Sequence, residues 1–159
     1  VLAGSGLKGA MRDAARNTDI SDKIEVIFGP DTDSAKEHAG AVSFSDGQLV
    51  AFPVRSLKEV FVYATSPLAL MRLSRLAGIA GINGVTWEFP NFSEDEACVR
   101  DERLLSNGKL VLEGFEFKKR NGADGLERAA KWLAENAVSK DEGFNFFKEK
   151  LNFYLTLFA

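Results

Sequence analysis

The sequence predicts an α+β fold, and three patterns support this prediction. Residues 123–137 place apolar side chains at the three- and four-residue spacing of an amphipathic helix. β-Branched and aromatic runs, such as residues 60–64 and 110–117, are typical of strands. The Asp46-Gly47 pair between two apolar runs favours a β-hairpin, which breaks the strand–helix–strand rhythm of a parallel α/β fold.

The composition is that of a globular protein with room for one domain. Of the 159 residues, 45% are hydrophobic and 27% are charged, and the formal net charge is -3. Such a chain is not a generally basic nucleic-acid coat, so a site for a polyanion must be a local patch. The single cysteine, Cys98, excludes an internal disulfide framework, and no secretory signal or apolar span of about 18 residues is present. These features predict a cytoplasmic protein that makes no membrane contact.

The chain opens on a glycine-rich turn that leads into a helix. Gly4 and Gly6 allow a positive φ and a close approach to the backbone, and Ser5 is the predicted N-cap. Three cations then recur every four residues and line one helix face: Lys8, Arg12 and Arg16. The neighbouring apolar stripe holds Leu7, Met11, Ala14 and Ala15. Free helix N–H groups and a column of cations suit a polyanion, but a capped helix with a solvated basic face has the same pattern.

Short apolar runs separated by turn residues follow this helix, which should end near residues 17–19. Residues 24–28 are predicted to form a short strand or a buried segment, and residues 31–40 a polar surface loop or a single helical turn. Asp31 and Asp33 do not complete an EF-hand, because Lys36 and Val42 stand where glycine and glutamate are needed. The predicted hairpin pairs residues 41–44 with 48–52, and Pro53 ends its second strand.

A central strand is predicted over residues 60–64. The next helix begins at Ser66-Pro67, since proline is favoured at the first helical position, and ends at Gly78. Residues 78–108 are long for a connector and predict an extended hairpin or a mobile flap. Its aromatic residues could stack on bases, although a locally packed cluster is favoured: Trp87, Phe89 and Phe92. A strand at 110–117, helices at 123–137 and 143–150 and a strand-like stretch at 151–159 complete the chain.

Glycines at 4, 6 and 9 also match the G-x-G-x-x-G fingerprint of dinucleotide-binding folds. The context fits poorly, because Glu25 lies inside an apolar run and the following hairpin breaks the βαβ pattern. A nucleotide-cofactor-binding enzyme that uses Gly4, Gly6 and Gly9 is the alternative from another functional class, and a plain α+β interaction module is a third. The lone histidine, His38, supports neither a Ser-His-Asp triad nor a multi-histidine metal site.

Several stretches of the chain together resemble a known family. Residues 3–12, Ala-Gly-Ser-Gly-Leu-Lys-Gly-Ala-Met-Arg, are similar to the glycine–serine–lysine–glycine signature of the RAMP superfamily of CRISPR proteins. Residues 28–30, 39–47 and 52–58 resemble one branch of that superfamily, and residues 65–70 and 112–117 also fit it. This branch is the repeated backbone subunit of the type III-B RNA-guided RNA-targeting effector complex, which acts in antiviral defence.

The resemblance implies one RAMP domain over residues 1–159, with an RNA-recognition-like (ferredoxin-like) core of antiparallel sheet and helices. Copies of such a subunit stack along a guide CRISPR RNA with other subunits and receive a target single-stranded RNA. A thumb-like insertion, expected here at residues 78–108, kinks the guide–target duplex. The residues expected to face the guide backbone are Gly4, Ser5, Lys8 and Arg12, with Arg55, Ser56 and Lys58 as a second set.

Two departures from the family pattern affect these expectations. Gly6 stands where the family usually has a second serine, so one expected hydroxyl contact is missing. The family cleaves target RNA with an aspartate upstream of the glycine motif and a divalent metal such as magnesium, and this chain is expected to begin after that loop and to lack the C-terminal end. An intact member would therefore be a metal-dependent endoribonuclease. This chain is expected to bind guide RNA and to carry no catalytic residue, metal ligand or cofactor of its own.

Overall fold

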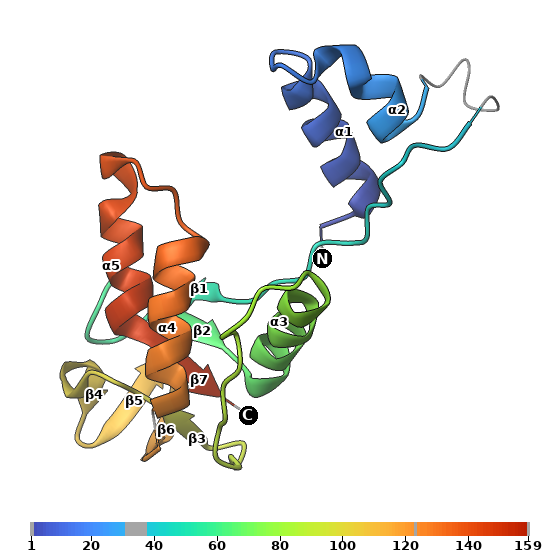
Figure 1. Ribbon diagram of the computed structural model, residues 1–159. Coiled ribbons are helices and arrows are strands. Elements are labelled where there is room, and N and C mark those ends of the chain that lie inside the picture. Colours follow the sequence, from blue (N-terminus) through green and yellow to red (C-terminus); the bar gives the residue numbers. More distant parts are fainter. Residues whose placement is uncertain (1, 31–37, 123, 159) are drawn as a thin grey trace. The chain divides into compact units, whose positions relative to one another are not determined.

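The computed structural model describes residues 2–30, 38–122 and 124–158, and the chain falls into two compact units, Val1–Leu49 and Val50–Ala159. In the described residues the first unit is helical and the second carries the sheet (Figure 1). Asp31, Asp33 and Lys36, which the sequence analysis weighed as a cation loop, lie outside the described residues. The single domain with a thumb-like insertion stays a prediction.

Helix α1 (Gly4–Ala15) forms where the sequence predicts it and ends before the turn residues at 17–19. The prediction that Ser5 caps this helix is wrong, because the N-cap residue is Ala3 and Ser5 lies within the first turn. The cap comes instead from Asp46, whose Oδ1 accepts a hydrogen bond from the Gly4 N–H at 2.8 Å. A carboxylate at this end of a helix is stabilised by the helix dipole.

Residues 24–28 form helix α2 (Ile24–Phe28) after a 3-10 turn, η1 (Ser21–Lys23), so the predicted strand is wrong. The pattern of burial gives the reason. Ile24, Ile27 and Phe28 turn away from solvent at the spacing of one helix face, whereas Val26 is 65% exposed. Phe28 then stacks on Phe44 with ring centroids 5.8 Å apart, which anchors the helix within the unit.

The hairpin predicted at 41–52 does not form. Gly47 pairs with Leu2 in an isolated antiparallel bridge, in which the Gly47 N–H donates to the Leu2 carbonyl at 2.7 Å. The Leu2 N–H donates to the Gly47 carbonyl at 3.2 Å in return. The Asp-Gly pair therefore serves α1, because Asp46 caps the helix and Gly47 holds the chain that leads into it.

The second unit contains a seven-stranded sheet in the order β1-β2-β7-β3-β6-β5-β4. The β2–β7 and β3–β6 pairs are parallel and the remaining pairs are antiparallel, so the sheet is mixed. Pro53 lies inside the edge strand β1 rather than after it, and an edge tolerates proline. The strands are β1 (Phe52–Val54), β2 (Val62–Thr65), β3 (Glu96–Cys98), β4 (Leu105–Ser106), β5 (Lys109–Leu112), β6 (Phe115–Arg120) and β7 (Leu155–Phe158).

The chain that leaves β1 pairs with the far side of the sheet. Ser56 forms an antiparallel bridge to Leu112, and the Leu57 N–H donates to the Val111 carbonyl at 3.1 Å. The sheet thereby curls around a small apolar core, whose buried members are Val62, Ala97, Val99, Leu104, Leu110 and Leu112. Residues 55–57 are thus fixed by the backbone of the β5–β6 hairpin.

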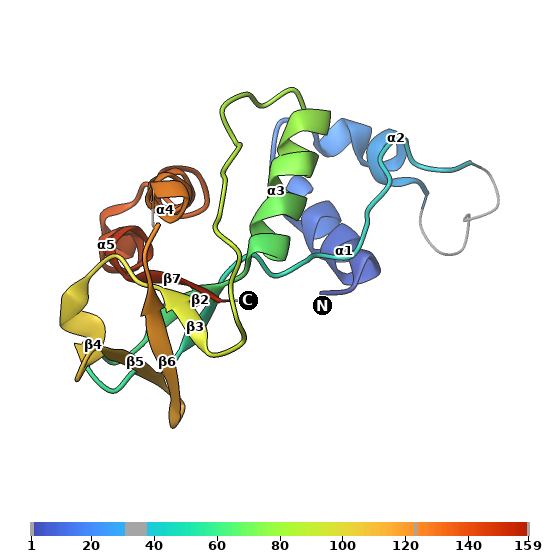
Figure 2. The same cartoon turned by 90° about the horizontal axis from the view of Figure 1, so that it is seen from below.

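Three helices of the second unit share the larger core with strands β3 and β7: α3 (Pro67–Ile79), α4 (Asp124–Asn136) and α5 (Asn145–Tyr154). Figure 2 shows α4 and α5 side by side, with the β5–β6 hairpin extending away from them.

Helix α3 begins as predicted, with Pro67 first and the Ser66 Oγ accepting from the Ala69 N–H at 3.2 Å. Helix α5 follows a 3-10 turn, η4 (Glu142–Phe144), and runs four residues further than predicted. Among the described residues, no helix is long and apolar enough to cross a membrane.

Much of the stretch 78–108 belongs to the body of the second unit. Strand β3 lies inside the sheet, and a 3-10 turn, η3 (Glu102–Leu104), buries Leu104. Trp87 is 8% exposed and packs edge-on against Trp132, with centroids 6.0 Å apart. A Cβ added to Gly125 would lie 2.1 Å from the Glu88 carbonyl oxygen, so this segment lies directly on α4. These parts of the stretch therefore pack into the second unit, while a thumb-like or flap insertion within residues 78–108 stays a prediction.

The single strand predicted at 110–117 is two strands joined by a tight turn. Glu113 and Gly114 have φ values of 49° and 89°, and Asn107 and Gly108, between β4 and β5, have φ values of 51° and 76°. Two consecutive residues with positive φ make the turn type that matches the twist of a two-residue hairpin. The Asn-Gly pair signals such a turn in the sequence, whereas glutamate at a positive φ does not.

Candidate nucleic-acid interface

Helix α1 carries the first predicted set of RNA contacts: Gly4, Ser5, Lys8 and Arg12. Ser5 is exposed, Lys8 is half-buried, and Lys8 forms no ion pair within the described residues. Gly4 is buried, and its N–H is already bonded to Asp46. The first N–H group of the helix thus bonds to a carboxylate of its own unit, and the side chains of α1 and the other N–H groups of its first turn remain for an anion.

Arg12 and Arg16 differ in their surroundings. Arg12 is half-buried, and its Nη1 donates to the Pro30 carbonyl at 3.2 Å. Arg16 is exposed and lies 3.8 Å from Asp13, a contact of little energetic weight at an exposed surface. The cation column predicted from the four-residue spacing therefore includes one member, Arg12, that also holds the fold of the unit.

Two glycines of the family-like motifs are needed for close backbone packing. A Cβ on Gly4 would lie 2.7 Å from the Phe44 carbonyl oxygen and 2.8 Å from the backbone of Ser45. A Cβ on Gly40 would lie 2.5 Å from backbone atoms of Phe28 and Gly29. The motif stretches around residues 4, 29 and 40–46 therefore pack against one another within the first unit.

The nucleotide-cofactor alternative depended on a glycine loop, and the structure does not contain that loop. Gly4, Gly6 and Gly9 all lie inside helix α1. A Cβ on Gly6 or Gly9 would meet no atom within 4 Å, so neither glycine marks a close approach. A dinucleotide fingerprint instead places its glycines in the turn between strand and helix.

The connection between β1 and β2 carries the second predicted set, Arg55, Ser56 and Lys58. Ser56 is 9% exposed, and its Oγ accepts a long hydrogen bond from the Lys58 N–H at 3.4 Å. The Arg55 and Lys58 side chains are exposed and form no ion pair in the described part of the chain. Ser56 thus has a structural role in the bridge to Leu112, while its two neighbours present their charges to solvent.

The Arg55 backbone is held by Glu113 at both of its polar atoms. The Arg55 N–H donates to Glu113 Oε1 at 3.3 Å, and the Glu113 N–H donates to the Arg55 carbonyl at 3.2 Å. This two-bond contact gives a reason for glutamate at a φ of 49° in the hairpin turn. The two predicted sets lie in different units, α1 in the first and the connection in the second.

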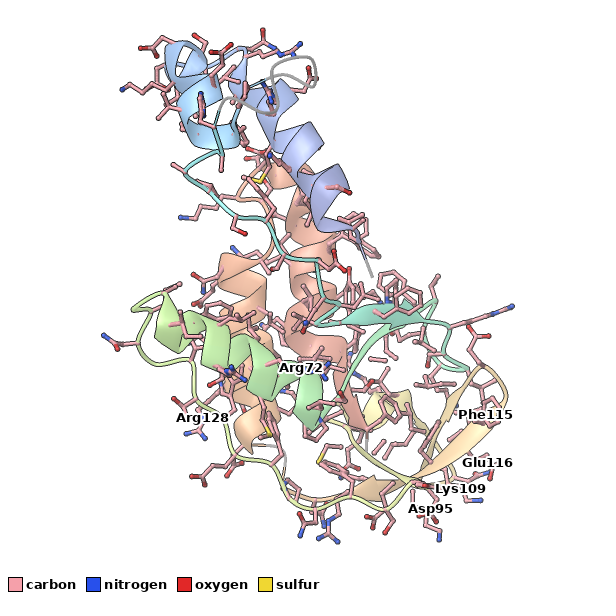
Figure 3. All side chains as sticks on the ribbon, turned by 90° about the vertical axis from the view of Figure 1, so that its right-hand side faces the viewer. Arg72, Asp95, Lys109, Phe115, Glu116 and Arg128 are labelled. Carbon is pink, nitrogen blue, oxygen red and sulfur yellow. The ribbon has the colours of Figure 1, made fainter. Side chains whose placement is uncertain are left out.

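The most basic run of the chain, residues 118–120 on β6, is neutralised by carboxylates. Lys118 Nζ lies 2.6 Å from Asp95, Lys119 pairs with Glu102, and Arg120 lies 3.8 Å from Glu96. The hydrogen bond from Lys118 lowers the pKa of Asp95 below its ordinary value. Figure 3 shows Asp95 beside the hairpin on which Lys109 and Glu116, 2.5 Å apart, also pair. These ion pairs join β6 to the neighbouring strand β5, to the start of β3 and to η3.

Sequence reasoning missed exposed cations on the helices of the second unit. Arg72 on α3 and Arg128 on α4 (Figure 3) are exposed, as is Arg75 on α3, and none of the three forms an ion pair within the described ranges. Helix α3 has no acidic residue, which is the signal that could have identified the first two. These three arginines add positive potential to the second unit, but no sequence motif assigns a function to them.

The remaining candidates have no special geometry. The favoured interpretation of the aromatic residues at 87, 89 and 92 is confirmed, since all three belong to or pack against the larger core. His38 is exposed and lies beside the Ala39 carbonyl. Across residues 2–30, 38–122 and 124–158, no three His, Cys, Asp or Glu side chains gather as a metal site.

The whole chain, residues 1–159, matches the RAMP superfamily. It is 38% identical over 143 residues to the CRISPR system Cmr endoribonuclease Cmr4 of Pyrococcus furiosus, covering 89% of this chain and 48% of that protein. The crystal structure of oligomeric Cmr4 from Pyrococcus furiosus superposes with a TM-score of 0.77 at 31% identity, covering 99% of this chain and 58% of that one.

A cryo-EM structure of the type III-B Cmr-beta complex bound to cognate target RNA shares the fold alone, with a TM-score of 0.52 at 22% identity over 75% of this chain and 46% of that one. The chain spans about half the length of the Cmr4 proteins that it matches. Because the superfamily match extends over every residue, the chain belongs to the RAMP superfamily of CRISPR proteins.

Proposed function

We propose that this chain is part of a backbone subunit of a type III-B CRISPR effector complex and that it binds the backbone of a guide RNA. Its similarity to Cmr4, which has been crystallised in an oligomeric form, supports a partnership with copies of itself. A chain of the Cmr-beta complex bound to target RNA shares its fold. The proposed contacts are Ser5, Lys8 and Arg12 on α1 and Arg55 and Lys58 on the connection, with Gly4 and Ser56 shaping the backbone beside them.

One observation carries this proposal. The basic run on β6 is paired with carboxylates, whereas Lys8, Arg55 and Lys58 form no ion pair in the described chain. A cation without a protein partner is available to a phosphate and can release the counterions that accompany it. The charges in the family-like motifs are therefore available to RNA, as are those of Arg72, Arg75 and Arg128, which no motif assigns.

The strand order supports a ferredoxin-like core as the finer description of the fold. Strands β7, β3, β6 and β5 are neighbours in that order, with β3–β6 parallel and the flanking pairs antiparallel. Along the chain they follow the order β3-β5-β6-α4-α5-β7, which fits the β-α-β-β-α-β motif if η3 and β4 replace its first helix and α4 and α5 together replace its second.

The activity of the whole protein is a further part of this proposal. A subunit of this class would hold the guide beside a target single-stranded RNA, join other subunits in the cytoplasm for antiviral defence, and cleave the target with a divalent metal such as magnesium. No three metal-binding side chains gather among the described residues, and no cleavage step is assigned to them.

Salt titration of guide-RNA binding to the intact protein tests the contacts. Each phosphate contact with single-stranded nucleic acid contributes about 0.7 to the slope of log affinity against log salt. Lys8→Ala and Lys58→Ala should each reduce the slope by about that amount. Lys23→Ala is the matched control, since Lys23 is exposed, lies in η1 outside the motif residues and forms no ion pair within the described residues. An unchanged slope for both Lys8→Ala and Lys58→Ala would show that these surfaces do not contact RNA.

Arg12→Ala needs a second measurement, because Arg12 also donates to the Pro30 carbonyl. Its melting temperature is measured beside its RNA affinity. A loss of affinity at an unchanged melting temperature supports a direct contact, whereas parallel losses assign Arg12 to the fold of the first unit.

A further inference from the structure

Lys150 is a cation that the RNA-binding proposal does not use, and its burial is unusual for a lysine. It lies on α5, and its side chain is 10% exposed. Its Nζ lies 4.3 Å from the ring centroid of Tyr154 and 5.6 Å from that of Phe146. Contacts with ring faces stabilise an ammonium group by cation–π attraction, but burial of the charge still requires a hydrogen-bonding partner.

The partner is Glu59, which lies 91 residues away in the sequence. Glu59 Oε2 accepts a hydrogen bond from Lys150 Nζ at 2.6 Å, and the Glu59 side chain is 31% exposed. Removal of one member of such a pair leaves the other without compensation, so a partly buried pair is sensitive to the placement of both groups. The pair therefore fixes the position of the connection at residue 59 relative to α5.

This tether completes a set of contacts along the β1–β2 connection. Its first half is held by the bridge of Ser56 to Leu112 and the bonds between Arg55 and Glu113. Its second half is held by side chains, since Phe61 packs on Phe146 with centroids 6.2 Å apart and Glu59 bonds to Lys150. Lys58, which lies between the two halves, is exposed, whereas the neighbouring Glu59 is half-buried.

We propose that Glu59 and Lys150 form a positioning pair that holds Arg55 and Lys58 where they meet the guide-RNA backbone, and that Lys150 itself does not touch RNA. This inference rests on the proposed function. Without the pair, the connection would become ordered only when RNA binds. The conformational entropy lost in that ordering would weaken RNA affinity.

The direction in which one charge-removing substitution changes RNA affinity distinguishes a positioning role from a general electrostatic effect. Loss of a carboxylate normally strengthens RNA binding, because it removes a repulsive charge. If Glu59 positions the connection, Glu59→Gln in the intact protein should instead weaken guide-RNA affinity by about two- to tenfold. Glu149→Gln is the matched control, since Glu149 is exposed, lies beside Lys150 on α5 and forms no ion pair in the described chain. It should leave affinity unchanged or raise it slightly.

The Lys150→Met variant tests the second half of the proposal. Methionine retains an unbranched apolar stem among the aromatic rings, so a positioning role predicts the same loss for Lys150→Met as for Glu59→Gln. If Lys150 contacted RNA directly, Lys150→Met would weaken binding while Glu59→Gln, which releases the lysine, would strengthen it. That opposite pair of signs would overturn the proposal.

A double-mutant cycle and hydrogen exchange exclude a general loss of structure. In an Arg55→Ala/Lys58→Ala background, Glu59→Gln should produce no further loss of affinity, because the groups that it positions are gone. Amide exchange of residues 55–61 should rise in Glu59→Gln, with the sheet strands unchanged. An equal loss of affinity in both backgrounds, or unchanged exchange, overturns the positioning role. No effect of Arg55→Ala or Lys58→Ala alone would instead overturn the RNA contacts themselves, which is a distinct failure.

Discussion

Asp46 caps helix α1 through a 2.8 Å hydrogen bond from the Gly4 N–H to its Oδ1, so a carboxylate occupies the helix end where the sequence suggested room for a phosphate. Helix N-termini attract anions through free N–H groups and the helix dipole. Here part of that attraction is used within the unit itself. For RNA binding, the side chains of α1, Lys8 first among them, therefore carry a larger share of the attraction.

The Asp46 cap should stabilise the first unit measurably. Asp46→Ala removes the acceptor and should lower the free energy of unfolding by about 1–2 kcal/mol. Asp46→Asn retains a side-chain oxygen that caps helices nearly as well, so it should stay within about 0.5 kcal/mol of wild type. Denaturant unfolding of the intact protein measures both, and amide exchange over α1 locates the effect. Equal stability of Asp46→Ala and wild type would contradict the capping role.

Substitutions of the α1 glycines should have opposite signs. The Cβ of Gly4→Ala would meet the backbone of Phe44 and Ser45 at 2.7–2.8 Å, so the loops must shift, at a cost of about 1–3 kcal/mol. Gly6→Ala adds its Cβ into open space within the helix and should stabilise by about 0.5–1 kcal/mol. The same unfolding measurement compares the two. Destabilisation by Gly6→Ala would show that this glycine approaches another group.

The elements predicted best from the sequence are those whose signals are local. Ser66-Pro67 starts α3 as expected, because a cap and a first-turn proline act within three residues of each other. Asp46-Gly47 misled the prediction because its partners, Gly4 and Leu2, are more than forty residues away. The run at 24–28 is apolar enough for a strand, and only its packing through Ile24, Ile27 and Phe28 makes it helical.

The candidate site was predictable only in part, because the sequence shows the charged residues but not the distant partners that neutralise some of them. Lys8, Arg55 and Lys58 are visible as charges within motifs. Whether a charge is neutralised depends on residues distant in sequence, such as Asp95 opposite Lys118 or Glu59 opposite Lys150. The close packing of Gly125, the second residue of α4, likewise depends on Glu88, a residue distant in sequence.

Gly125 should therefore be intolerant of any side chain. Gly125→Ala would place a Cβ 2.1 Å from the Glu88 carbonyl oxygen and force the 85–92 segment off α4. We expect a loss of about 2–3 kcal/mol, at the upper end of the overpacking range. Gly78→Ala in α3 is the control, because its Cβ would meet nothing within 4 Å and should be neutral or stabilising. Thermal unfolding of the intact protein checks both, and a neutral Gly125→Ala would contradict the close contact.

The Cys98 thiol should be chemically inert in the folded protein. Cys98 is 0% exposed, its Sγ donates to the Arg120 carbonyl at 3.3 Å, and burial raises the pKa of the thiol above its ordinary value. Because the thiolate is the reactive form, iodoacetamide at pH 8 should label Cys98 far more slowly than an exposed thiol. Ser93→Cys, at an exposed position, provides that comparison in the same chain. Mass spectrometry of the labelled peptides, before and after unfolding, measures the rates, and rapid native labelling of Cys98 would contradict its burial.

Glu59 should contribute stability that disappears in acid. Its hydrogen bond from Lys150 lowers the pKa of the carboxyl group below the ordinary value. A lowered pKa means that the folded state favours the ionised form, so the contribution is complete above the unfolded pKa of about 4.3 and is lost as pH falls through the folded pKa. The difference in free energy of unfolding between wild type and Glu59→Gln should therefore be constant from pH 8 to about pH 5 and shrink below about pH 4.3. Because Lys150 is the main cause of the shift, an NMR titration should find the Glu59 pKa closer to its ordinary value in Lys150→Met.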